Sequence, residues 1–428
     1  MNRFYSPIVA CVVLWFVSSA PTFAQGVFLR AVSAKNEGMA GVAAATPVDS
    51  LGALHWNPAT ITAFDSSSMS FGSAIVLASA TLDSSFQPPG QDRLTGSTRS
   101  NTGAVPAPFM GLIMQNPESP WTFGFSLDAI GGAQVNFAGT DTNPILSEEY
   151  GLGRTSAKVE AFQLTPAASL KLTDKLSVGL SPNIVISRLI AEPLFFGPTG
   201  VNPMTDNAEW GKGAGTRYTW GCGFQVGLFY ETDANWNFGF SYRSQTWAEK
   251  FPYNVTTADG NDHEARFRLR FPPVYIFGIS YDGFEDTIIG CDMKYFDYAK
   301  TPGFEYIGVN PDGSAKGLGW QSVFSVAVAA QHKLNSYLTV RGGYSFNENP
   351  ITSQSLAFNV PCPLILQQGV HCGATVAVRG WEFDVAYTHM FKNTIDGTYP
   401  RWAAVDPEAY IRMSSSADVI AMGVTRNF

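Results

Sequence analysis

The sequence predicts an all-β membrane protein, a fourteen-stranded antiparallel transmembrane β-barrel with an N-terminal hatch, or plug, inside its lumen. Three observations predict this fold. From residue 67 to the C-terminus, apolar and polar side chains alternate in long runs. The connections between these runs are alternately short and long. The segment ahead of them, 25–66, is rich in Gly and Ala and lacks such alternation.

The composition of the 428-residue chain favours a barrel over a soluble domain. Charged residues make up 14% of the chain, against roughly 25% in typical soluble domains. Aromatic residues reach 13% and there are 41 glycines. A membrane strand alternates lipid-facing and lumen-facing side chains, so a barrel is apolar without any long apolar run. The net charge of −8 argues against nucleic acid as a partner.

The N-terminus predicts a cleavable secretory signal over residues 1–24. Arg3 supplies a positive charge, residues 8–17 are apolar, and Thr22-Phe23-Ala24 is typical of a cleavage site, so the mature chain begins at Gln25. The apolar run is shorter than the about 20 residues that a membrane-spanning helix needs. Secretion and a barrel together predict the outer membrane of a Gram-negative bacterium.

The alternation has a period of two residues, as in a strand with one apolar and one polar face. For example, Trp236, Phe238 and Phe240 alternate with Asn237 and Gly239. In a membrane barrel the apolar face contacts lipid and the polar face lines the lumen. The fourteen predicted strands cover residues 67–82, 107–116, 121–137, 157–172, 176–191, 216–231, 236–247, 263–282, 287–297, 319–334, 337–346, 370–378, 382–390 and 418–428.

The connections predict the direction of the strands. Six short turns alternate with seven long, polar, Gly- and Pro-rich loops, which is typical of outer-membrane barrels with tight periplasmic turns and long extracellular loops. An even number of strands places both ends of the barrel chain on the periplasmic side. The last strand ends on Phe428, a terminal aromatic residue of the kind that such barrels present to the barrel-assembly machinery.

The width of the barrel predicts a role for the hatch, residues 25–66. Side chains fill the lumen of a barrel of about eight strands, and a wider lumen stays open. Residues 25–66 form the only long unassigned segment on the periplasmic side, so we expect them to fill the lumen. Within the hatch, Asn57-Pro58-Ala59 favours a stable turn with an Asx hydrogen bond.

Several segments resemble one known family. The stretches QGVFLRAVSAKNEGMAGVAAATPVDSLGALHWNPATI, LTDKLSVGL, RFPPVYIFGISYD and WEFDVAYTH are similar, in this order and spacing, to the FadL/TodX group of outer-membrane transporters. These proteins take up long-chain fatty acids and aromatic hydrocarbons. The resemblance covers nearly the whole mature chain.

The resemblance implies a plugged fourteen-stranded barrel that takes up hydrophobic compounds by passive diffusion. It implies that Asn57, Pro58 and Ala59 belong to the hatch, that residues 25–28 reach an interior site, and that a kinked strand opens a lateral exit into the membrane. The chain departs from the family at 362–367, where an acidic-basic pair is common and no charge is present, and in its short fourth long loop. The substrate, fatty acid or hydrocarbon, therefore stays open.

Three arginines are candidates for binding a substrate carboxylate. Arg266, Arg268 and Arg270 occupy every second position and therefore share one face of the predicted strand 263–282. That face should line the lumen, where guanidinium groups can bind a carboxylate in bidentate fashion. The alternatives are a structural network with acids such as Glu264 or Asp292, or contact with the phosphates of lipopolysaccharide.

Further candidates follow from the same parity and from apolar loop residues. Arg243 and Arg341 also face the lumen by parity. Phe195 and Phe196 belong to a loop that is apolar for an exposed segment, which favours a surface for first substrate capture. The alternative for these two rings is packing among the loops.

Prolines predict interruptions of the wall. Pro272-Pro273 cannot donate to a sheet ladder, so strand 263–282 should break or bulge there and could form a gate. Pro166 and Pro182 in neighbouring strands are rival positions for such a gate.

Four cysteines remain after the signal. Cys362 and Cys372 flank a short Pro-containing segment and could form a disulfide in an oxidising compartment. Cys222 and Cys291 lie in strand-like runs, where we expect them to be small apolar residues.

The sequence predicts no enzyme, catalytic residue, cofactor or metal site. A barrel enzyme that acts on lipids would need a Ser with a nearby His. By parity His332 and His389 face lipid, and His55, His263 and His371 lack an evident partner. Such an enzyme, a general porin and an adhesive surface protein remain the alternatives to a monomeric transporter embedded in outer-membrane lipid and lipopolysaccharide.

Overall fold

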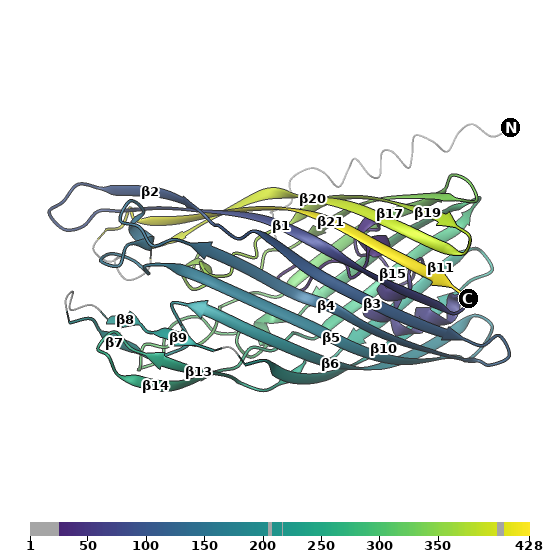
Figure 1. Ribbon diagram of the computed structural model, residues 1–428, viewed down its shortest axis with the longest axis horizontal. Coiled ribbons are helices and arrows are strands. Elements are labelled where there is room, and N and C mark those ends of the chain that lie inside the picture. Colours follow the sequence, from purple (N-terminus) through teal and green to yellow (C-terminus); the bar gives the residue numbers. More distant parts are fainter. Residues whose placement is uncertain (1–24, 204–207, 216, 400–405) are drawn as a thin grey trace.

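The computed structural model describes residues 25–203, 208–215, 217–399 and 406–428, so the predicted signal peptide lies outside the described chain. Fourteen antiparallel strands form the wall of a closed barrel, with the short strands β2 and β12 attached to it (Figure 1). The wall strands are β1 (Ser68–Phe86), β3 (Ala104–Gln115), β4 (Trp121–Phe137), β5 (Thr155–Lys171), β6 (Leu176–Glu192), β10 (Thr219–Glu231), β11 (Trp236–Arg243), β15 (Val274–Phe284), β16 (Thr287–Phe296), β17 (Val323–Lys333), β18 (Leu338–Asn347), β19 (Gln368–Val378), β20 (Trp381–Thr398) and β21 (Tyr410–Asn427).

Each wall strand pairs with its neighbours in the sequence, and β21 closes the barrel on β1 from Ser68↔Asn427 to Ser85↔Tyr410. The predicted strand count and topology are therefore confirmed. The alternation sorts side chains as expected: Phe238 and Phe240 are exposed on the outer face, whereas Asn237 is buried on the inner one.

Strands β20 and β21 are longer than the sequence predicted, because they continue past the barrel together with β1 and β2 (Leu94–Arg99). Figure 1 shows this extension at the end of the barrel opposite the C-terminus. Its residues are largely polar, so the alternation that marks a lipid-facing strand stops before the strand does.

The prediction of a single strand over residues 263–282 is wrong. Its first part, β14 (Asp262–Phe267), pairs with β13 (Phe251–Thr256) in a separate loop sheet that also contains β9 (Lys212–Ala214). The wall strand β15 begins only at Val274, after Pro272-Pro273. The chain is thus interrupted where two residues without N–H groups were expected to interrupt it.

The remaining elements are short and belong to loops. They are β7 (Thr199–Val201), β8 (Ala208–Trp210), β12 (Trp247–Ala248) and the 3-10 helices η2 (Pro144–Leu146), η3 (Tyr298–Lys300) and η4 (Leu356–Asn359). No helix in the described part of the chain is long and apolar enough to cross a membrane.

The hatch lies inside the barrel and contains α2 (Ala34–Gly38), α3 (Ser50–Trp56) and η1 (Pro58–Ala63). Ser33 and Asp49 cap the N-termini of α2 and α3. Nearly every residue from 31 to 62 is buried, and the two helices and η1 contact strands on several sides of the wall. A lumen of fourteen strands is therefore filled by a segment of the same chain, as its width requires.

Candidate functional site

The turn Asn57-Pro58-Ala59 joins the hatch to the wall. The side chain of Asn57 accepts a hydrogen bond from the amide of Ala59 at 3.1 Å, which is the expected Asx turn. Its Nδ2 donates to the carbonyl oxygens of Ala44, at 2.7 Å, and of Leu228 in β10, at 3.0 Å. Ser169 of β5 donates to the Pro58 carbonyl at 2.6 Å. Because Asn57 is fully buried, these bonds satisfy groups that water cannot reach.

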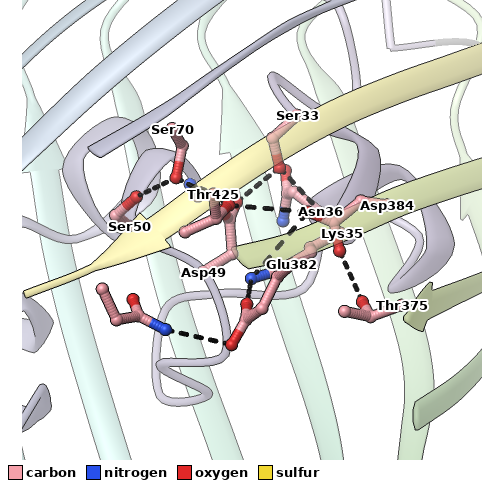
Figure 2. A network of polar contacts seen from close by, with 12 residues as sticks. Ser33, Lys35, Asn36, Asp49, Ser50, Ser70, Thr375, Glu382, Asp384 and Thr425 are labelled. Atoms are coloured by element: carbon pink, nitrogen blue, oxygen red, sulfur yellow. Dashed lines mark hydrogen bonds and ion pairs between the residues drawn. The ribbon is translucent and has the colours of Figure 1, made fainter. Parts of the chain in front are cut away.

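A second contact between hatch and wall is ionic. Lys35 of α2 forms ion pairs with Glu382 and, at 3.9 Å, with Asp384, both on β20. The Lys35 side chain is only 8% exposed, so loss of one partner would leave a charge buried without compensation. Figure 2 shows the hydroxyl, amide and carboxylate groups that surround this pair. They belong to Ser33, Asn36, Asp49, Ser50, Ser70, Thr375 and Thr425.

A third contact ties the middle of the hatch to β16. Asp292 accepts hydrogen bonds from the amides of Ala43, at 2.9 Å, and Ala44, at 3.1 Å. Lys294 donates to the Gly41 carbonyl at 2.7 Å and lies 3.6 Å from the Asp292 carboxylate. These contacts bind the hatch to β5, β10, β16 and β20.

The first residues of the hatch, 25–31, run along β4 and are called the N-terminal arm below. The amide of Leu29 donates to the carbonyl of Ile130 at 2.8 Å, and Phe28 pairs with Gly131. The Phe28 ring packs against Phe271, with centroids 5.1 Å apart. The arm thus occupies part of the edge of β4.

The wall is open where the arm lies. Pairing of β3 with β4 ends at Phe109↔Asp128. Beyond that point residues 104–108 pair with β1, and residues 129–137 pair with β5, but the two segments do not pair with each other. A register shift at Ile130 marks a bulge, which bends a strand and ends its pairing. This gap in the wall is called the β3–β4 gap below.

Two sequence features accompany the β3–β4 gap. Pro106 and Pro108 stand in β3 and have no N–H to offer a neighbouring strand. Gly131-Gly132 follow the bulge in β4. The predicted positions for a gate, Pro272-Pro273, Pro166 and Pro182, do not include this one, although Pro106 and Pro108 stand two residues apart in one strand.

Pro166 and Pro182 mark a smaller interruption. In β5 and β6, pairing stops after Leu164↔Ile184 and resumes at Ala168↔Leu180. In this register the two prolines stand directly opposite each other, and neither has an N–H group. The strands remain adjacent on both sides of the interruption, so the β3–β4 gap is the larger opening.

A cavity of about 490 Å³ lies beside the β3–β4 gap. Most of its lining residues are small and apolar, and they come from β1, β3, β4, β5, β21 and the N-terminal arm. Val105 and Ala107 line it from the inner face of β3, and Pro106 and Pro108 from the outer face. A cavity bordered by both faces of one strand reaches around its edge to the outside of the barrel. Charged lining residues are Arg30, Glu37, Lys158 and Glu160.

The prediction that Arg266, Arg268 and Arg270 line the lumen is wrong, because the strand leaves the wall at Pro272-Pro273. Arg266 lies on β14 in the loop sheet, is 63% exposed and forms an ion pair with Glu264 at 2.7 Å. Arg268 is exposed, and half-buried Arg270 donates to Gln245 at 3.2 Å. Only Arg266 lies in a strand, and Arg268 and Arg270 follow β14 in irregular backbone of the same loop region.

Arg243 and Arg341 face the lumen as predicted, and both are buried. Arg243 donates to the His55 carbonyl of the hatch and to Gln225. Arg341 donates to Gln331 at 2.7 Å and Thr375 at 2.6 Å. Neither lines the cavity, so their contacts in this structure are with the wall and the hatch.

Phe195 and Phe196 pack among the loops and do not form an exposed capture surface. Phe195 is 3% exposed and contacts Trp210, with ring centroids 4.8 Å apart. Phe196 stacks on Phe267 of the loop sheet. In the same cluster, burial raises the pKa of Tyr253, whose hydroxyl donates to the Leu189 carbonyl at 2.9 Å. The loop carries its apolar residues because it has a core of its own.

The predicted disulfide is wrong, since Cys362 and Cys372 are free thiols. Cys372 is exposed on the outer face of β19, where its Sγ lies against the Tyr387 carbonyl. Cys362 lies in the loop that precedes β19. The free Cys222 is also exposed, on the lipid-facing side of β10, and free Cys291 is partly buried in β16.

Two of the three histidines that lack an evident partner in the sequence, His55 and His371, have partners in the structure. His55 lies 3.0 Å from Asp128. His371 contacts Ser345 at 2.8 Å and Thr388 at 2.7 Å, and its Nδ1 lies 3.6 Å from the Glu37 carboxylate. Ser345 is 1% exposed and does not line the cavity, so the Ser–His pair holds the hatch and presents no nucleophile. Within the described residues no group of three or more His, Cys, Asp or Glu could hold a metal ion.

The structure is similar to several solved outer-membrane channels. The toluene transporter TodX of P. putida superposes with a TM-score of 0.68 at 16% identity, over 95% of this chain and 99% of that one. A FadL homologue of Pseudomonas aeruginosa gives 0.72 at 15% identity, over 94% and 100%. The toluene transporter TbuX of Ralstonia pickettii gives 0.64 at 15% identity, over 94% and 99%.

The sequence identities to these three proteins are low, so the structural similarity shows a shared fold and nothing more. No curated protein sequence matches the chain. A family model, the outer membrane protein transport proteins (OMPP1/FadL/TodX), matches residues 15–428. The chain is therefore a member of the OMPP1/FadL/TodX family of outer-membrane transport proteins.

Proposed function

We propose that this protein imports hydrophobic small molecules, long-chain fatty acids or hydrocarbons, across the outer membrane by passive diffusion. The observation that carries the proposal is the cavity beside the β3–β4 gap. Its lining of small apolar side chains suits a hydrophobic substrate, because burial of apolar surface drives binding. Membership of the family supports the same function.

The hatch argues for exit through the wall and not through the lumen. It is buried and bound to the wall at Asn57, Lys35 and Asp292, so a straight path to the periplasm is filled. A substrate in the cavity is separated from lipid only by the edge of β3. We therefore place the exit at the β3–β4 gap, where a hydrophobic molecule can pass into the membrane without crossing water.

Removal of the bulge tests this route. Deleting Ile130 takes the extra residue out of β4 and lets pairing with β3 continue beyond Phe109↔Asp128. We expect the variant to fold and to lose most uptake. Growth of a deletion strain that carries the variant, on oleate and separately on alkylbenzenes, measures the effect and also shows which substrate class the wild type serves.

The matched control is deletion of Gly283 from the register shift between Tyr281 and Phe284 in β15, away from both the gap and the cavity. This variant should retain uptake. Normal growth with the Ile130 deletion, at normal levels of folded protein, would rule out the lateral exit. Growth of the wild-type strain on neither compound would argue against the proposed function as a whole.

The outer surface of the barrel and its C-terminus suggest the other partners of the protein. We infer that exposed aromatic side chains of the wall, such as Phe238 and Phe240, contact outer-membrane lipid. We also infer that the barrel works as a monomer among lipopolysaccharide, and that the assembly machinery recognises Phe428. Phe428 is 67% exposed, and its amide donates to the Ser67 carbonyl at the seam of the barrel. Deleting Phe428 should lower the amount of assembled barrel, measured by its heat-modifiable migration on gels.

A further inference from the structure

The first residue of the predicted mature chain, Gln25, is buried at the end of the N-terminal arm. Cleavage after Ala24, as the sequence predicts, leaves Gln25 with a free α-amino group. Gln25 is 4% exposed and lines the cavity. Its carbonyl accepts a hydrogen bond from the Tyr298 hydroxyl at 3.1 Å, and the same hydroxyl accepts one from the Val27 amide at 3.1 Å. The end of the arm is therefore held against η3.

The backbone around Gln25 is fixed by a tight turn. Gly26 has a φ of 77°, in the left-handed region that favours glycine. A Cβ built on Gly26 would stand 2.5 Å from the Tyr298 hydroxyl oxygen. Tyr298 is fully buried and packs against Phe304 and Trp320, with ring centroids 5.0 Å away in each case. The chain end therefore lies beside an aromatic cluster and away from water.

An α-ammonium group at this place has no free counter-charge among the described residues that line the cavity. The acids in the lining are Glu37 and Glu160. Glu37 accepts a hydrogen bond from Thr388 at 2.7 Å, and Glu160 forms an ion pair with Lys158. Arg30 lines the same cavity and adds a further positive charge. Because burial of an unpaired charge is costly, a charged chain end opposes docking of the arm.

The side chain of Gln25 adds a second unfavourable group. Its Nε2 is buried and has no hydrogen-bond partner within the described chain. Buried polar atoms of native proteins are nearly always paired. Two nitrogen atoms of one residue, the α-amine and Nε2, are therefore poorly suited to the place that the residue occupies.

One reaction within the residue removes both problems. The α-amine of an N-terminal glutamine can attack Cδ of its own side chain. A bond forms between the α-nitrogen and Cδ, the bond from Cδ to Nε2 breaks, and Nε2 leaves as ammonia with the proton that the amine gives up. The product is pyroglutamate, a neutral five-membered lactam. The step is intramolecular and consumes no oxidant, reductant or co-reactant.

We propose that Gln25 is converted to pyroglutamate in the mature protein, and that the loss of its charge stabilises the docked N-terminal arm. The proposal rests on the predicted cleavage after Ala24 and holds whichever hydrophobic compound the protein transports. The ring closes after cleavage and before the arm is buried, while the chain end is in water. The lactam keeps one N–H donor and one carbonyl acceptor and presents no charge to the cavity.

Chemical labelling of free amines tests the modification. Mature protein is isolated from outer membranes, denatured and reductively dimethylated before digestion with trypsin. Trypsin cleaves after Arg30, so the peptide 25–30 reports the state of the chain end. We expect this peptide to be lighter than its unmodified form by one ammonia and to carry no methyl groups. A dimethylated amine cannot close the ring, so labelling before digestion excludes a ring that forms during sample handling.

Gln25→Ala tests the role of the lost charge, because alanine cannot cyclise and the chain end keeps its ammonium group. The readout is hydrogen exchange of the Leu29 amide, which donates to the Ile130 carbonyl at 2.8 Å when the arm is docked. At about pH 6 this amide should exchange about tenfold faster than in the wild type, since docking then buries an unpaired charge.

The pH dependence separates the charge from the side chain. The ordinary pKa of an α-amino group is about 8, so the chain end of Gln25→Ala is mostly neutral at about pH 9. The ratio of the exchange rates of variant and wild type should therefore return to about one. The titratable groups around the arm are common to both proteins and cancel in this ratio; they are Arg30, Glu37, Lys158, Glu160 and Tyr298.

Gln134→Ala is the matched control. Gln134 also lines the cavity, and its Nε2 donates to the Thr102 carbonyl at 3.3 Å. Its replacement removes a glutamine side chain from the lining and leaves the chain end unchanged, so Leu29 should exchange as in the wild type at both pH values.

Two kinds of result would overturn the proposal. A dimethylated Gln25, or a mature chain that begins at another residue, would exclude the modification. Exchange of Leu29 in Gln25→Ala that equals the wild-type rate at about pH 6, or that is accelerated by the same factor at about pH 9, would exclude the role of the charge.

Discussion

At the scale of single residues, glycines in the wall decide how closely the hatch can approach. A Cβ built on Gly227 of β10 would stand 2.0 Å from Oδ1 of Asn57, and one on Gly179 of β6 would stand 2.4 Å from the Ala59 amide. Both positions face the Asn57-Pro58-Ala59 turn. Asn57 can therefore bond to the wall only because the wall residues that face the turn are glycines, which have no side chain.

Gly227→Ala should destabilise the barrel by about 1–3 kcal/mol, because the added methyl group overpacks a filled site and displaces Asn57. The free energy of unfolding of the purified protein in denaturant measures this. Gly342→Ala is the control, since the nearest atom to a Cβ there is 3.8 Å away. Equal stability of the two variants would show that the Asn57 contact contributes nothing.

At the scale of elements, α2 is joined to β20 by the ion pairs of Lys35 shown in Figure 2. Such pairs contribute little net stability when formed, but breaking one leaves a buried charge. The same reasoning separates them from ion pairs of the extracellular extension, such as Arg412 with Asp396, whose side chains are 48% and 57% exposed.

Lys35→Met should cost about 3–5 kcal/mol, because Glu382 and Asp384 lose their buried counter-charge. Arg412→Met should cost about 0–1 kcal/mol, as for other surface pairs. Unfolding in denaturant measures both. Adding Glu382→Gln to Lys35→Met should restore part of the loss, and a double variant no better than the single one would contradict the ionic account.

At the scale of the whole molecule, the barrel and the hatch are complementary. Fourteen strands enclose more space than their own side chains can fill, and the hatch of the same chain fills it. The remaining space is a cavity of about 490 Å³ that opens sideways at the β3–β4 gap. The hatch therefore fills the lumen, and the cavity lies beside the part of the wall where β3 and β4 do not pair.

In planar bilayers the intact protein should show no large, stable open-state current, because the hatch blocks the flow of water and ions. A variant that lacks residues 25–66 should conduct, since the lumen is then open. Large currents from the intact protein would indicate a general porin. If this variant is folded and shows no current, the loops must also close the barrel.

The sequence alone determined the wall. Alternation of period two is a local property of each strand, and a closed membrane barrel must satisfy every backbone group between strands. Together with the alternation of short turns and long loops, those two facts predicted fourteen strands and the inward face of Arg243, and the width of the lumen predicted the buried position of the hatch. Parity also predicted one face of a wall strand for Arg266, Arg268 and Arg270, and it could not show that the chain leaves the wall before Pro272-Pro273.

Only the tertiary structure decided where pairing fails and which polar groups meet. The β3–β4 gap depends on a bulge in one strand and prolines in another, and neither feature has a defined partner until the strands are aligned. The same holds for His371 of β19, which contacts Ser345 of β18 and the Glu37 carbonyl of the hatch. Local pattern fixes the face on which a side chain lies, whereas its neighbours depend on register and on how the hatch folds back. The site is therefore a property of the assembled barrel.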